Sequence, residues 1–161
     1  MLRRLGLMAL ARPDYRAAND GARTRLRSVI EVCGHGAFGQ VGPAILGHIA
    51  FWDGYYAARW EARIGGDVEA HRALGPLVDS INAAGWPIWS ALALADAAAL
   101  ATAAANRIDA VVASLSPQLI AEVEAQGRHR LLERALHRNE HLDELEQHLS
   151  AEGRRHGATR P

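Results

Sequence analysis

Apolar residues recur every three or four positions along most of this chain, and that spacing predicts amphipathic helices. Four long segments show it: residues 14–32, 43–64, 91–115 and 128–151. A glycine-rich loop at 33–42 follows the first segment, Pro43 suits the first turn of the second, and Gly65 and Gly66 end it. No alternating pattern typical of a strand is present. The prediction is an all-α protein, with four long helices and short connections forming an antiparallel four-helix bundle over residues 14–150.

The segments between these helices contain helix-breaking residues. Residues 67–75 are polar, and we expect them to be irregular. Gly85 and Pro87 are expected to interrupt any helix in 77–94, leaving a short helical piece and a turn into the third long helix. Ser116-Pro117 is expected to start another short turn, and Gly127 to mark a loop. Residues 1–13 and 151–161 are read as tails at the two ends.

Composition narrows the class of protein. The chain has 161 residues, enough for one domain with a sizeable core, and its 18 basic residues balance 18 acidic ones. With no excess of positive charge, the chain has no electrostatic attraction for nucleic acid or for an anionic membrane. The single cysteine, Cys33, excludes an internal disulfide and is typical of a reducing cytosol, so we expect a cytoplasmic protein. No apolar run approaches the roughly 20 residues of a membrane span.

The first residues allow two other interpretations. Met1–Ala11 contains two arginines and a short apolar patch that ends in an A-x-A pattern, as a secretory signal does. The apolar part of this segment is at the short limit for a secretory signal. Translation from a start codon upstream of the true one would explain the segment equally well. We therefore treat residues 1–13 as a tail.

Histidines form the clearest chemical pattern. His137, His141, Glu144 and His148 share one face of the last predicted helix, where two imidazoles four residues apart can bind one metal ion. A third ligand must come from elsewhere, and His48, inside the aromatic stripe of the second helix, can supply it in a bundle. Three neutral imidazoles leave a coordination position open, which is typical of a catalytic site. Zinc, nickel and iron all suit such ligands.

Three segments together resemble the DinB-like superfamily: HIAFWDGYYAARWE around His48, VDSINAAGWPIW at 78–89, and LLERALHRNEHLDELEQHL at 131–149. That superfamily includes mycothiol-dependent maleylpyruvate isomerases, bacillithiol transferases and small stress or self-protection proteins. The resemblance covers about residues 14–150. It implies a four-helix bundle, often dimeric, with one metal held by a histidine of helix two and a pair on helix four. Those positions match His48, His137 and His141.

The sequence therefore favours a metal-dependent enzyme that acts on a small electrophilic molecule, most simply a thiol transferase, an isomerase or a hydrolase. A low-molecular-weight thiol or a water molecule would be activated at the ion and attack the electrophile. One alternative is a non-catalytic stress or self-protection protein that binds a metal or sequesters a ligand. Another is a helical interaction module whose histidines are incidental. No motif assigns a substrate, and a homodimer is expected.

Several other residues are weaker candidates. Arg59 and Arg134 suit an anionic substrate or the carboxylate of a thiol cofactor, although arginines on helices more often cover the core. Cys33 and His35 form a C-x-H pattern in the glycine-rich loop, for which a structural role is favoured over ligation or nucleophilic attack. Glu144 and His148 continue the histidine face along the helix. They are expected either to contact the metal-binding histidines or to be surface residues. The aromatic residues expected to line the core and a cleft are Trp52, Tyr55, Tyr56, Trp86 and Trp89.

Overall fold

The computed structural model describes residues 14–33, 39–67 and 74–157, and within them it confirms an all-α protein without strands. The predicted tail 1–13, residues 34–38 of the glycine-rich loop and residues 68–73 and 158–161 lie outside this description. The elements are α1 (Tyr15–Cys33), α2 (Val41–Ile64), α3 (Leu77–Ser90), α4 (Leu94–Ser114), α5 (Pro117–Ala125), the 3₁₀ helix η1 (His129–Leu131) and α6 (Arg134–Gly157).

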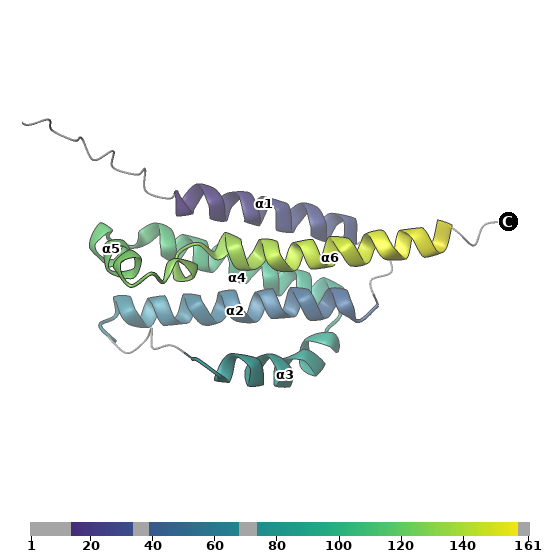
Figure 1. Ribbon diagram of the computed structural model, residues 1–161, viewed down its shortest axis with the longest axis horizontal. Helices are drawn as coiled ribbons and strands as arrows, with labels where there is room; N and C mark the ends of the chain where they lie inside the picture. The colour runs from purple at the N-terminus through teal and green to yellow at the C-terminus, as the bar shows by residue number, and fades with distance from the viewer. Residues whose placement is uncertain (1–13, 34–38, 68–73, 158–161) are drawn as a thin grey trace, which may run out of the picture.

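Four of these helices, α1, α2, α4 and α6, are long and lie side by side (Figure 1). Helices α2 and α6 run in opposite directions. His48, early in α2, contacts His141, whereas Trp60, about three turns later in α2, donates a hydrogen bond to the carbonyl of Leu131, which precedes α6. The connection between α2 and α4 is not short, as it contains α3. This helix returns the chain along the outside of α2, so α4 runs in the same direction as α2 (Figure 1).

Helix α3 differs from the sequence prediction, because it continues through both Gly85 and Pro87 to Ser90. The indole of Trp89 explains the glycine: a Cβ added at Gly85 would lie 2.4 Å from that ring. Trp89 is buried, and its packing against α2 holds the last turn of α3 although Pro87 contributes no backbone hydrogen bond. Tertiary packing here outweighs the local preference to break the helix.

The last two helices also have bounds that differ from the prediction. Ser116 starts the nine-residue helix α5 rather than a short turn, and its hydroxyl caps the helix by accepting from the Leu119 N–H. Helix α6 begins at Arg134 rather than near Arg128, and it continues to Gly157, beyond the predicted start of the tail at residue 151. A tight 3₁₀ turn precedes it, which shows that leucine spacing alone does not locate a helix start.

The interior has two apolar clusters separated by a buried polar layer. One cluster gathers around Ile45, Leu46, Ile49 and the alanines of α4, and the other around Trp60 and Ile108. Between them along α2 lies Asp53, which has no exposed surface. Each cluster stabilises the packing of the long helices, and the polar layer between them holds the side chains that matter for the site described next.

No described helix is by itself long and apolar enough to cross a membrane. Helices α4 and α5 pass that test of length and composition only when taken together, and they meet at an angle of 102°.

Candidate metal centre

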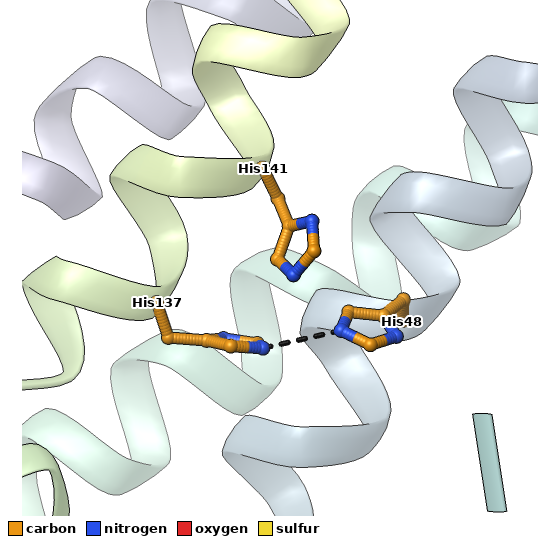
Figure 2. Close-up of side chains that lie close together, drawn as sticks. All are labelled: His48, His137 and His141. Carbon is orange, nitrogen blue, oxygen red and sulfur yellow. Dashed lines mark hydrogen bonds between the residues drawn. The ribbon is translucent and has the colours of Figure 1, made fainter. Parts of the chain in front are cut away.

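Three histidines from two helices lie close together (Figure 2). His48 comes from the N-terminal third of α2, and His137 and His141 come from successive turns of α6. The Nε2 atoms of His48 and His137 are 3.2 Å apart, and the three residues offer ligand atoms that all lie within 4.8 Å of one another. The structure therefore brings together the three residues singled out in the sequence, in an arrangement that could hold a metal ion.

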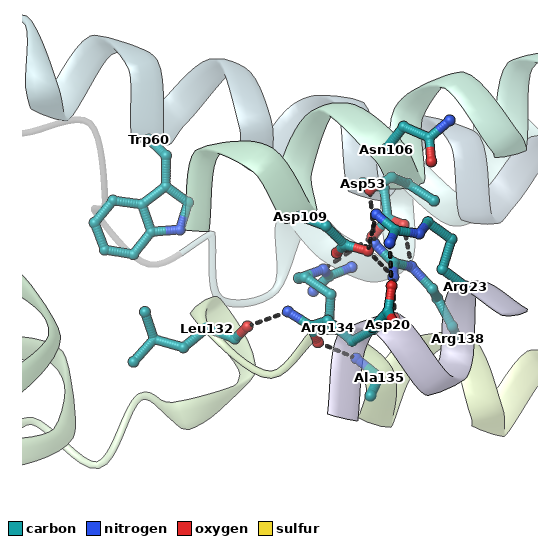
Figure 3. A network of polar contacts seen from close by, with 12 residues as sticks. Asp20, Arg23, Asp53, Trp60, Asn106, Asp109, Leu132, Arg134, Ala135 and Arg138 are labelled. Atoms are coloured by element: carbon teal, nitrogen blue, oxygen red, sulfur yellow. Dashed lines mark hydrogen bonds and ion pairs between the residues drawn. The ribbon is translucent and has the colours of Figure 1, made fainter. Parts of the chain in front are cut away.

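A buried carboxylate sets the register between the two helices that carry these histidines (Figure 3). Asp53 lies five residues after His48 on α2, and it accepts from two arginines of α6. Its Oδ1 atom is 2.9 Å from Arg134 Nε, and its Oδ2 atom is 2.6 Å from Arg138 Nε. Because these arginines flank His137 along α6, the ion pairs hold His137 at the level of His48.

The same layer reaches the two remaining long helices. Arg138 is fully buried and binds Asp109 of α4 through both terminal nitrogens, at 3.0 and 2.7 Å. Asn19 of α1 donates to the carbonyl of Leu132 and accepts from the N–H of Ala135, at 2.9 Å each. All four long helices therefore meet in one hydrogen-bonded layer, which is the kind of network that favours a single packing arrangement.

The polar layer was not identified in the sequence, although a signal for it was present. Asp53 stands inside the aromatic stripe of the second predicted helix, where an unpaired carboxylate would be costly. Arg138 lies beside the histidines on the last predicted helix, four residues after Arg134. A charged residue within an apolar stripe, and two arginines one turn apart on another helix, together indicate a buried ion pair.

The surroundings of His48 and His137 favour the neutral imidazole. Burial, followed by the nearby His141 and Arg134, lowers the pKa of His48 to about 4. Burial likewise lowers the pKa of His137 well below its usual range, with Arg134 as the next cause. A neutral imidazole is the form that binds metal ions, so protons compete less with a metal at these two residues than at an exposed histidine.

The Nδ1 atoms of His137 and His141 on α6 differ in their surroundings. His141 Nδ1 lies 3.3 Å from Glu144 Oε2, and a carboxylate at that position orients an imidazole so that its Nε2 can face a ligand. Glu144 therefore contacts the histidine cluster, whereas His148, one turn further, is exposed. The Nδ1 atom of His137 is buried and has no hydrogen-bond partner within the described residues.

A cavity of about 260 Å³ opens beside the three histidines. Helix α3 closes one side of it, where Trp52 Nε1 of α2 donates to Asn82 Oδ1 at 2.9 Å. The indole of Trp89 also packs edge-on against His48, with ring centroids 5.1 Å apart. Besides the histidines, the residues that line the cavity are Trp52, Tyr56, Val78, Asn82, Arg130 and Arg134.

The remaining sequence candidates are distributed differently. Arg134 lines the cavity, whereas Arg59 donates to the hydroxyl of Tyr55 at 2.8 Å and is not among the lining residues. Trp86 is 42% exposed and also lies outside the lining. Cys33 is the last residue of α1, and its predicted neighbour His35 lies outside the described residues. The structure thus places one of the two arginine candidates beside the histidines.

Comparisons of the chain with protein-family models, with curated proteins and with solved structures found no match in any of the three. The resemblance to the DinB-like superfamily accordingly stays a prediction based on the three sequence segments quoted above.

Proposed function

We propose that this protein is a metal-dependent enzyme that joins a thiol or water to a small electrophilic molecule, or isomerises such a molecule, in the cavity beside His48, His137 and His141. The observation that carries the proposal is the convergence of three imidazoles, from two helices, on the wall of a cavity large enough for a small molecule. The four long helices are then the DinB-like bundle that the sequence resembles.

The donor set suits a divalent ion of the zinc, nickel or iron kind. Tetrahedral zinc with bonds of about 2.0–2.1 Å holds its ligand atoms about 3.3 Å apart. The separation between the Nε2 atoms of His48 and His137 is 3.2 Å, and no ligand atom of the three lies more than 4.8 Å from another. Three nitrogen donors leave room in the coordination sphere for a fourth ligand, as a catalytic rather than a structural site requires.

When bound, such an ion lowers the pKa of a thiol or of water, which provides a nucleophile near neutral pH. The side chains of the chain supply position and exclude water. Trp52 is 4% exposed, and with Tyr56 it forms an aromatic wall that suits the apolar part of a ligand. The bond from Trp52 to Asn82 ties α3 to α2 and keeps this wall in place.

Further parts of the proposal concern location and assembly. One cysteine in 161 residues supports a reducing compartment, and we propose the cytoplasm. Phe51, Trp86 and Ile88 on α2 and α3 are 38%, 42% and 66% exposed, and they support a homodimer because such side chains are often covered in an assembly.

Metal content is the decisive first measurement. Untagged wild type, His48→Ala and the control His148→Ala would be purified in parallel, incubated with zinc or nickel, desalted and measured by mass spectrometry. We expect about one metal per chain in the wild type and the control, and a large loss in His48→Ala. A wild type that retains no metal would refute the proposal.

Turnover separates an enzyme from a metal-binding protein that only sequesters a ligand. The metal-loaded wild type would be screened against pairs of small thiols and electrophiles, with His48→Ala as the blank. Product formation that depends on His48 supports the enzyme. Stoichiometric metal without turnover of any pair would instead favour the non-catalytic protein.

A further inference from the structure

The cavity beside the histidines has an unusual charge distribution. Two arginines line it, Arg130 of η1 and Arg134 at the start of α6, and no aspartate or glutamate is among its described lining residues. Arg130 also pairs with Glu140, but both side chains of that pair are more than half exposed, so solvent weakens the attraction. The described lining therefore contains two guanidinium groups and no carboxylate, and Asp53, which pairs with Arg134, lies outside it.

Arg134 is the better placed of the two arginines to bind a ligand. It is 2% exposed, and its guanidinium lies over the ring of Tyr56, with the Cζ atom 4.5 Å from the ring centroid. Its Nε atom donates to Asp53, and Nη1 lies 3.3 Å from the carbonyl oxygen of Arg130. Two contacts and a stacked ring thus hold the guanidinium in one orientation, which reduces the entropy lost when a ligand binds.

One nitrogen of this guanidinium lacks a partner. Within the described residues, Arg134 Nη2 is buried and makes no hydrogen bond. A buried donor of a charged group without an acceptor is costly, and native structures keep few of them. Asp53 does not serve as the acceptor for Arg134 Nη2, because its second oxygen accepts from Arg138.

A second donor belongs to the same cavity. The indole nitrogen of Trp52 can only donate, so the atom of Asn82 that it contacts is the amide oxygen. The Nδ2 group of Asn82 is then the end of the amide that can donate to a ligand. Arg134 and Asn82 therefore bring N–H groups from two helices, α6 and α3, to the lining of the same cavity.

We propose that Arg134 and Asn82 form a carboxylate-binding subsite, so that the natural ligand is a small organic acid whose carboxylate lies against Arg134 and whose other end faces the histidines. The cavity size and the aromatic wall of Trp52 and Tyr56 suit a compact, partly apolar acid. This inference deepens the proposed function and rests on it for the role of the histidines. The carboxylate contact itself needs no metal.

Benzoate and its neutral analogue benzamide provide a matched pair of probes. Calorimetric titrations would use the wild type, Arg134→Gln, Arg134→Lys and the control Arg63→Gln. Arg63 pairs with Glu122, and neither residue lines the cavity. We expect the wild type and the control to bind benzoate and to prefer it over benzamide. Arg134→Gln should weaken benzoate binding about 10-fold, because a hydrogen bond to a charged group is lost, without weakening benzamide. Arg134→Lys should recover part of the affinity.

Each titration would be repeated on metal-free and zinc-loaded protein, with mercaptoacetate and acetate as a second pair. If the natural ligand is a free acid, benzoate should bind equally well with and without zinc. A carboxylate carried by a thiol predicts that mercaptoacetate exceeds acetate only in the zinc-loaded protein, and that Arg134→Gln weakens it as well. Either result supports the subsite.

Failure of the subsite and failure of the proposed function give different results. Benzoate binding that Arg134→Gln leaves unchanged, in a variant whose circular dichroism spectrum and metal content match the wild type, would overturn the subsite while the metal site stands. A wild type that binds no metal but loses benzoate affinity in Arg134→Gln would support the subsite and refute the proposed chemistry. A misfolded Arg134→Gln would be replaced by Asn82→Ala, for which unchanged benzoate binding also overturns the proposal.

Discussion

Acid should destabilise the metal-free protein through His48, and the size of the effect follows from the structure. His48 is 7% exposed, and burial together with the nearby His141 and Arg134 lowers its pKa to about 4, whereas a histidine in the unfolded chain has a pKa of about 6.5. As the pH falls below about 6.5, the unfolded chain takes up a proton that folded His48 does not. The stability contributed by the neutral side chain is therefore lost as the pH falls from about 6.5 to about 4.

The magnitude is large compared with the stability of a small domain. Integrating the proton uptake of this one group gives a loss of about 2 kcal/mol between about pH 7 and about pH 4.5, against a typical total of about 5–15 kcal/mol. His137 contributes in the same direction, because its pKa is also lowered by burial and by Arg134.

The measurement is urea unfolding of EDTA-treated protein at several pH values, for the wild type and for His48→Gln. Glutamine does not titrate, so the free energy of unfolding of the variant should fall by about 2 kcal/mol less than that of the wild type over this range. The substitution also removes packing, but that cost is the same at each pH and cancels in the comparison. His148→Gln, at an exposed position, controls for the loss of a histidine. Equal pH dependence in wild type and His48→Gln would refute the assignment of His48 as a buried neutral group.

Three further outcomes follow from the packing and the ligands. Gly47→Ala should be less stable than Gly54→Ala by about 1–3 kcal/mol in urea unfolding, because a Cβ at Gly47 would lie 2.8 Å from the Cβ of Trp89, whereas one at Gly54 meets nothing within 4 Å. Asp53→Asn should cost about 3–5 kcal/mol in the same assay, since it leaves buried arginines without their shared carboxylate, and an unchanged midpoint would contradict the role given to the polar layer. Zinc at 100 times its dissociation constant should stabilise the wild type by about 2.7 kcal/mol in thermal unfolding, and His141→Ala should abolish most of that gain.

Much of the local structure could be predicted because it depends on neighbours in the sequence. The spacing of apolar residues predicted the long helices, and a spacing of four residues placed His137 and His141 on one face of α6. The failures lie where a distant residue intervenes. Helix α3 continues through Pro87 because Trp89 packs against α2, and α6 begins late because a tight turn occupies the preceding residues.

The sequence by itself determined that the chain is helical, that two histidines lie on one face of a helix, and that the charges balance. Only the tertiary structure decided that His48 meets this pair and that Arg134, unlike Arg59, borders the same cavity. The physical reason is that contacts between α2 and α6 depend on their direction and register. Asp53 sets that register through ion pairs with α6, and its partner Arg134 lies 81 residues later in the sequence. No periodicity within either helix specifies such a pairing.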